Sequence, residues 1–145
     1  DAESIARARK AAVGLEIRFE ATTTDKFRAG GDFDLITICD CIHDLADPVG
    51  TLKEIHALLK PDGTLFVVEP KAADRLEDNL NPVATMFYGF SIFHCMTQSL
   101  ARGGPGLGTC MGPAAAERLA REAGFGSFRV LDVKSQVNLF YAATP

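Results

Sequence analysis

Two apolar runs dominate the hydrophobic pattern of this chain. The first covers Phe33–Cys39 and the second covers residues 64–68. Residues 33–39 follow a buried-strand pattern, and residues 64–68 form a continuous apolar run of the kind found in sheets that are covered on both faces. Between them, apolar residues recur at helical spacing and predict a helix over residues 48–59, with Asp47 as its N-cap. Strand, helix and strand in this order predict a right-handed crossover between parallel strands, so the pattern indicates the α/β fold class.

The segments around this unit carry weaker patterns. Before it, helical spacing ends at Gly14, and alternating apolar and polar residues predict a strand over residues 15–21. After the crossover helix, Asp62 and Gly63 predict a turn. The later expected elements are a loop at residues 69–81, helical structure at 82–100, a glycine-rich connection at 102–112, a helix at 113–123, and a closing antiparallel hairpin of strands at 128–133 and 137–142.

Composition narrows the class of protein. With 145 residues and 47% hydrophobic content, the chain can form a substantial core. No apolar run approaches the roughly 20 residues that span a bilayer, and the 15 Lys and Arg residues are scattered, so we expect neither membrane insertion nor nucleic-acid binding. The four cysteines (Cys39, Cys41, Cys95 and Cys110) lie in or beside apolar segments, which suits reduced thiols and a cytoplasmic location.

Polar side chains follow the first apolar run directly. Asp40, His43, Asp44 and Asp47 come immediately after the strand. Open α/β sheets bind their ligands at the carboxyl ends of their strands. We therefore expect the functional site within residues 40–47.

The order of elements is accompanied by several short motifs. The chain reads Leu-Leu-Lys-Pro-Asp-Gly-Thr-Leu at residues 58–65, Ala-Gly-Phe at 123–125, Asp-Cys-Ile-His-Asp at 40–44, Val-Glu-Pro at 68–70 and Asp-Asn-Leu-Asn-Pro at 78–82. Together they resemble class I S-adenosylmethionine (SAM)-dependent methyltransferases, particularly bacterial and actinobacterial members. The resemblance covers nearly the whole chain.

This resemblance implies a Rossmann-like methyltransferase sheet that is incomplete. The family opens with a strand, a glycine loop and a second strand, which are absent before Asp1. Residues 1–145 would then be the C-terminal part of one methyltransferase domain, with residues 70–112 as an acceptor-side insertion. In the family strand order, 3-2-1-4-5-7-6, the strand at residues 17–21 has lost its neighbours. We expect it to pair with the missing N-terminal part or a second copy, as in a dimer, or to lie elsewhere.

A second glycine motif stands later in the chain. Residues 104–108 read Gly-Pro-Gly-Leu-Gly, which matches the Gly-x-Gly-x-Gly pattern of a cofactor loop. Such a loop must follow a buried strand and open a helix, whereas this segment follows a helical stretch. We interpret it as a mobile connection near the acceptor site.

The resemblance also implies cofactor contacts. Asp40 and Cys41 fall where the family lines the SAM pocket, Thr23 falls near the position of an acid that reads adenine, and Asp1 lies near the ribose-binding acid. For Asp40, an alternative is that nearby backbone N–H groups simply satisfy its carboxylate.

On the acceptor side, His43 is the candidate general base. It resembles the histidine of the His-Asp-Trp-Ser-Asp segment in small-molecule O-methyltransferases, although Leu45 and Ala46 replace the Trp and Ser. Methyl transfer needs alignment of donor and acceptor and, for a weak nucleophile, removal of its proton. Alternatively, His43 caps a turn and touches no substrate.

Other residues are candidates for substrate binding. Glu69 ends the next strand, and an aromatic stripe that includes Phe87 and Tyr88 could cap a flat acceptor; the same stripe could instead be core or a dimer surface. Cys39, Cys41 and His43 alternate on one strand face, but the chain has no second pair of ligands at zinc-like spacing, so no metal site is expected.

The sequence thus predicts SAM-dependent methyl transfer to a small molecule, at oxygen, by the parent protein. The chain alone is expected to be inactive because its glycine loop is absent. The alternative is a non-catalytic Rossmann-like binding or dimerisation module.

Overall fold

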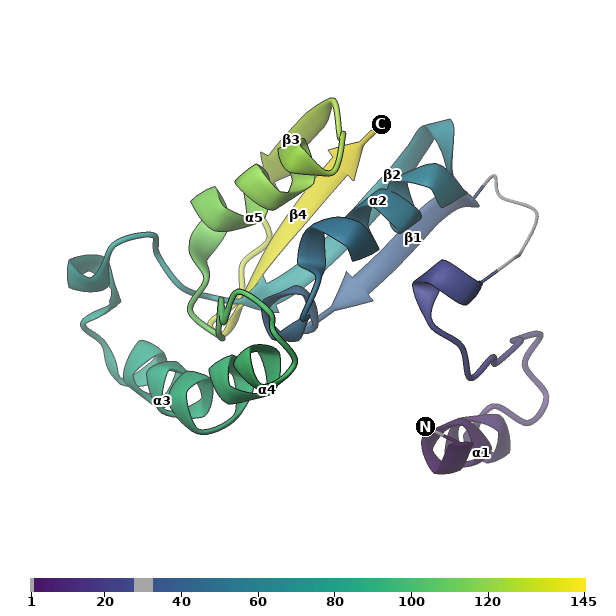
Figure 1. Cartoon of the computed structure of the whole chain (residues 1–145), viewed down its shortest axis with the longest axis horizontal. Helices are drawn as coiled ribbons and strands as arrows, with labels where there is room; N and C mark the ends of the chain where they lie inside the picture. Colours follow the sequence, from purple (N-terminus) through teal and green to yellow (C-terminus); the bar gives the residue numbers. More distant parts are fainter. Residues whose placement is uncertain (1, 28–32) are drawn as a thin grey trace.

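Four strands form one mixed sheet in the computed structural model, which describes residues 2–27 and 33–145. They are β1 (Phe33–Cys39), β2 (Leu59–Pro70), β3 (Ser127–Val130) and β4 (Asn138–Thr144). Their order across the sheet is β1-β2-β4-β3 (Figure 1). β1 and β2 are parallel, and β4 runs antiparallel to both β2 and β3. The expected α/β class and closing antiparallel hairpin are both confirmed.

The helices follow the expected order. The crossover helix α2 (Pro48–Leu58) begins at Asp47, whose carboxylate accepts a hydrogen bond of 2.8 Å from the Gly50 N–H and so confirms the N-cap. The remaining helical elements are α1 (Ala2–Ala11), α3 (Pro82–Phe90), the π-helical turn Ser91–Cys95, α4 (Met96–Ala101), α5 (Gly112–Glu122), and 3-10 turns at Thr24–Lys26, Ile42–Asp44 and Leu76–Asn79. In the described part of the chain, no helix has the length and apolar character that a bilayer crossing requires.

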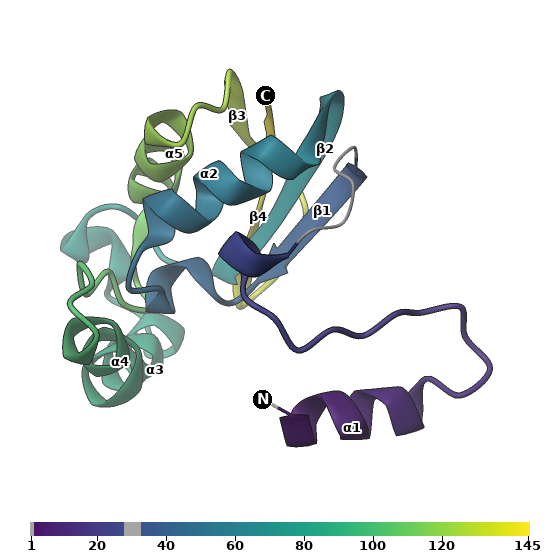
Figure 2. The same cartoon turned by 45° about the vertical axis from the view of Figure 1, so that its right-hand side comes forward.

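The core lies between the sheet and two helices on one of its faces. α2 and α5 lie side by side over that face (Figures 1 and 2), and Leu52 of α2 and Leu119 of α5 pack with Leu65 and Tyr141 of the central strands. On the opposite face, the half-buried rings of Phe66 and Phe140 stack with centroids 6.1 Å apart. The apolar run of β2 predicted that both faces of the sheet would be covered. In the described residues, helices cover only one face.

The prediction of a strand at residues 15–21 is wrong. This segment has no regular secondary structure and joins no strand pairing in the described sheet. Figure 2 shows it running away from the sheet together with α1. Leu15 and Ile17 are 62% and 54% exposed. Alternation of apolar residues predicts a strand only where a neighbouring edge supplies its hydrogen bonds, and among residues 2–27 and 33–145 no strand pairs with this segment.

The prediction of a turn at Asp62 and Gly63 is also wrong. Both residues belong to β2, at an irregularity where its pairing with β1 shifts between Phe33 and Leu35. A Cβ atom at Gly63 would lie 2.7 Å from the Phe33 carbonyl oxygen. Glycine is therefore required here by the close approach of the two backbones, and the extra residues form a bulge rather than a free turn.

Candidate functional site

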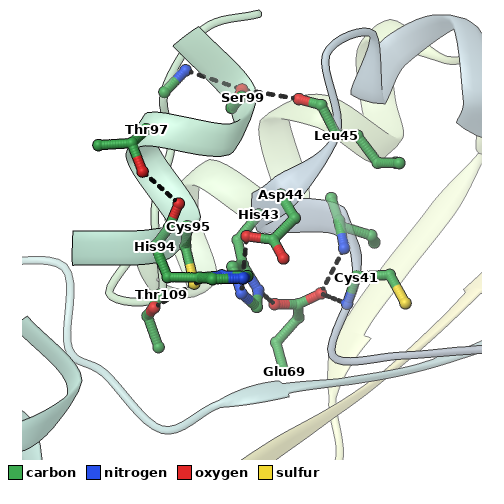
Figure 3. Close-up of polar contacts among 12 residues, drawn as sticks. Cys41, His43, Asp44, Leu45, Glu69, His94, Cys95, Thr97, Ser99 and Thr109 are labelled. Atoms are coloured by element: carbon green, nitrogen blue, oxygen red, sulfur yellow. Dashed lines mark hydrogen bonds and ion pairs between the residues drawn. The ribbon is translucent and has the colours of Figure 1, made fainter. Parts of the chain in front are cut away.

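The site begins where two parallel strands end next to each other. Cys39 at the end of β1 pairs with Val68 of β2, so the residues after them lie close together. His43, in the turn after β1, donates from Nδ1 to the Glu69 carboxylate at the end of β2 (Figure 3), in a short hydrogen bond. Both residues are 2% exposed. The fold thus brings together two residues that sequence analysis assigned separately.

The second oxygen of Glu69 is also occupied. Its Oε1 accepts hydrogen bonds from the Ile42 N–H at 2.8 Å and the Cys41 N–H at 3.3 Å. The carboxylate therefore holds both the imidazole and the backbone of the turn that carries it. Glu69 lies behind His43, whereas sequence analysis expected it on the acceptor wall.

The charges around His43 favour its protonated form. Burial opposes protonation, but the hydrogen bond to Glu69, together with the negative charges of Glu69, Asp44 and Asp40, outweighs it and raises the pKa of His43 above its usual value. Its other ring nitrogen, Nε2, lies 3.5 Å from Asp44 Oδ1. An imidazole held in this way accepts a proton readily and is stabilised once it is charged.

Asp40 occupies a strained position directly after β1. Its φ of 55° lies in the left-handed region, which is uncommon for a residue other than glycine. Its N–H donates to the Val68 carbonyl at 2.8 Å, and its side chain is exposed. The adjacent Cys41 donates from Sγ to the Cys39 carbonyl. Burial and the charges of Glu69 and Asp40 raise the pKa of the Cys41 thiol, so this cysteine stays protonated.

A cavity of about 430 Å³ opens beside these residues. Apolar and polar side chains contribute to it from six parts of the fold. The lining residues are Asp40, His43, Pro70, Phe87, Phe90, His94, Cys95, Thr109, Val137 and Asn138. A cavity of this size with apolar walls and a few polar groups suits a small organic molecule.

Not all predicted site residues meet at this cavity. Phe87 lines it, but the Tyr88 hydroxyl accepts a hydrogen bond from Asn79 Nδ2 at 3.3 Å and does not. Thr23 lines a separate, largely apolar cavity of about 480 Å³ between the Thr24–Lys26 turn, β1 and α2. Asp1 lies outside the described residues.

Several residues of the cavity had no predicted role. Cys95 comes from the π-helical turn and Thr109 from the glycine-rich connection, and the Thr109 hydroxyl donates to Cys95 Sγ at 3.0 Å. The connection is packed closely: the Gly108 N–H donates to the His43 carbonyl at 3.3 Å. The sequence predicted that this connection lies near the acceptor site, and that prediction could have pointed to Thr109 as a lining residue. The contribution of Asn138 depends on strand pairing that no local pattern reveals.

Comparison with known proteins identifies related chains. A family model described as a methyltransferase domain matches residues 1–126. A ubiquinone biosynthesis O-methyltransferase from Haemophilus ducreyi is 33% identical over a stretch covering 37% of this chain and 25% of the relative. This chain thus matches only about a quarter of that relative's length.

Two solved structures share the architecture. The trans-methyltransferase CalH in complex with SAH superposes with a TM-score of 0.62 and 25% identity, covering 99% of this chain and 39% of CalH. Human N-acetylserotonin methyltransferase in complex with SAM superposes with a TM-score of 0.53 and 26% sequence identity. The match covers 77% of this chain and 29% of that protein. The matched residues, the mixed sheet and the strand-end site agree: this chain belongs to the methyltransferase-domain family, within the class I SAM-dependent methyltransferases.

Proposed function

We propose that this chain forms the acceptor side of a SAM-dependent methyltransferase that methylates a small molecule at oxygen, with His43 as the general base. The observation that carries the proposal is the buried pair of His43 and Glu69 at the wall of a cavity lined by Phe87. A hydroxyl is a weak nucleophile, and a base at the wall of the acceptor cavity meets its need for proton removal.

The role of Glu69 follows from its contacts. A carboxylate can only accept, so Nδ1 carries the proton of the shared hydrogen bond and Nε2 presents a lone pair. When Nε2 takes the acceptor's proton, the negative charge of Glu69 stabilises the imidazolium. Glu69 is therefore a positioning residue that acts through His43, and we do not place it against the acceptor.

SAM, when bound, supplies the methyl group on a sulfonium. The exposed carboxylate of Asp40, held at a strained strand end beside the cavity, suits a cationic ligand. We propose Asp40 and Cys41 as one wall of the SAM site and Phe87 as part of the acceptor wall. Thr23 and Asp1 remain proposed cofactor contacts from the family resemblance. The solved relatives that hold SAM or SAH support this cofactor.

We also propose that residues 1–145 are the C-terminal part of the domain and that residues 70–112 are its acceptor-side insertion. The strand order β1-β2-β4-β3 corresponds to the last four strands of the family order, with β1 at the open edge. Leu35 on β1 is 57% exposed, and the face that carries Phe66 and Phe140 has no helix over it in the described residues. A further part of the protein, or a second copy, would cover these surfaces.

Titration with SAM tests the proposal. Isothermal calorimetry of SAM against this chain should give little or no heat, and a version extended upstream of Asp1 should bind it. Because the chain supplies one wall of the site, the contrast between the two proteins is the decisive result. Absence of heat from the extended version would end the enzymatic proposal and favour a non-catalytic binding or dimerisation module.

A further inference from the structure

Three potential metal ligands converge beside the cavity and come from different elements. One ligand atom from each of His43, Asp44 and Cys95 lies within 4.8 Å of the other two. His43 and Asp44 belong to the turn after β1, and Cys95 to the π-helical turn between α3 and α4. Figure 3 shows the three side chains directed toward one another. His43 and Cys95 are buried, at 2% and 8% exposure.

The hydrogen bonds of this cluster are incomplete. Asp44 Oδ1 is shielded from solvent and has no hydrogen-bond partner among the described residues. Its neighbour at 3.5 Å is His43 Nε2, the nitrogen that carries no proton in the neutral ring. A protonated ring forms an ion pair with Asp44. In the neutral ring, the two lone pairs face each other and repel, and the buried oxygen without a partner costs free energy. A cation between them would remove both costs.

The opposite side of the imidazole is arranged as in metal sites. A metal-bound histidine usually donates its other ring N–H to a carboxylate, which fixes the tautomer and directs the free nitrogen toward the ion. Glu69 does this for His43. A second possible group, Asp40 with His43 and Glu69, is a weaker candidate because the Glu69 oxygens already accept from His43, Cys41 and Ile42.

We propose that His43, Asp44 and Cys95 bind a thiophilic divalent cation, Zn²⁺, with the fourth position open toward the cavity. One thiolate, one imidazole and one carboxylate match the ligand types and count of an open zinc site. Both His43 and Cys95 line the cavity, so water or a ligand group can complete the coordination. The sequence predicted no metal because Cys39, Cys41 and His43 have no second pair of ligands at zinc-like spacing. The fold instead places Cys95, from a distant segment, beside His43 and Asp44.

Zinc at this place has a consequence for catalysis, which rests on the proposed function. Coordination uses the Nε2 lone pair that would accept the proton of the acceptor. Bound zinc would therefore switch off the base, and its removal by a chelator would restore it.

Cobalt substitution tests the site directly. Titration of the protein with Co²⁺ should produce the near-ultraviolet band of thiolate-to-cobalt charge transfer, and Zn²⁺ should displace the cobalt at a single site per chain. Cys95→Ser should abolish the band and weaken zinc binding by about tenfold or more, because the thiolate ligand is lost. Cys39→Ser is the matched control, since the exposed thiol of Cys39 lies outside the cluster. This variant should keep the charge-transfer band and the zinc affinity of the natural protein.

Several outcomes would overturn the site: no band in the natural protein, a band that survives in Cys95→Ser, or equal zinc affinity in both cysteine variants, which marks adventitious binding. If Cys95→Ser fails to fold by circular dichroism, the isosteric Asp44→Asn carries the test, and unchanged zinc affinity overturns the proposal. Binding is measured without SAM or acceptor, so its failure leaves the proposed base standing. Zinc bound with full turnover would instead remove His43 as the base.

Discussion

Replacing His43 by alanine in the upstream-extended protein should lower the turnover of the methyl acceptor by about 10²–10⁴-fold, the usual contribution of a general base. The residue lies at the cavity wall with Nδ1 committed to Glu69, so Nε2 is the ring nitrogen that remains to accept the hydroxyl proton. Transfer of labelled methyl from SAM to the best acceptor of a panel of hydroxylated aromatic compounds measures the effect.

His56→Ala is the matched control. His56 lies on α2 and packs edge-on against Phe125, with ring centroids 5.1 Å apart, and it does not line the cavity. It should retain turnover. SAM affinity should be similar in both variants, because the proposed cofactor wall is not altered. Unchanged turnover in His43→Ala, with SAM still bound, would show that His43 only caps its turn.

Replacing Glu69 by alanine should destabilise the fold by about 3–5 kcal/mol, the range seen when one partner of a buried ion pair is removed. The change leaves the His43 imidazole and the N–H groups of Cys41 and Ile42 without their acceptor in a buried place. Urea unfolding followed by circular dichroism measures the free energy of unfolding.

Glu77→Ala serves as the comparison for this stability measurement. Glu77 pairs with Arg75 on the surface, and both side chains are largely exposed. An exposed pair contributes about 0–1 kcal/mol. A loss in Glu69→Ala as small as that in Glu77→Ala would mean that the carboxylate does not organise the strand ends.

The parts of the fold that sequence analysis predicted are those with a local cause. β1 is a mostly apolar run that contains Asp34 and Thr37, α2 has its N-cap at Asp47, and α5 ends before Gly124, whose φ of 104° suits glycine. Residues 15–21 carry an equally regular pattern, yet they form no strand. A strand depends on a neighbouring edge, which is not a local property.

The candidate site also combines features that the sequence predicts with features that depend on the folded structure. The order strand, helix and strand predicted that β1 and β2 are parallel, and His43 and Glu69 follow or end these strands, although the two residues were assigned separately. The sequence could not indicate that Glu69 lies behind the imidazole, since that depends on side-chain direction. Cys95 and Thr109 reach the cavity only through the path of residues 82–112 around it, which no spacing rule determines.

The pH dependence of turnover is the most direct test of the central claim, that His43 acts as a base held by Glu69. A base acts in its neutral form, so turnover should rise with pH to a plateau. Because the surrounding carboxylates outweigh burial and raise the pKa of His43, the midpoint should lie above its ordinary value of 6.5. Glu69→Gln removes the nearest charge and should move the midpoint to lower pH. A midpoint at or below 6.5, or one that is unchanged in Glu69→Gln, would contradict the account.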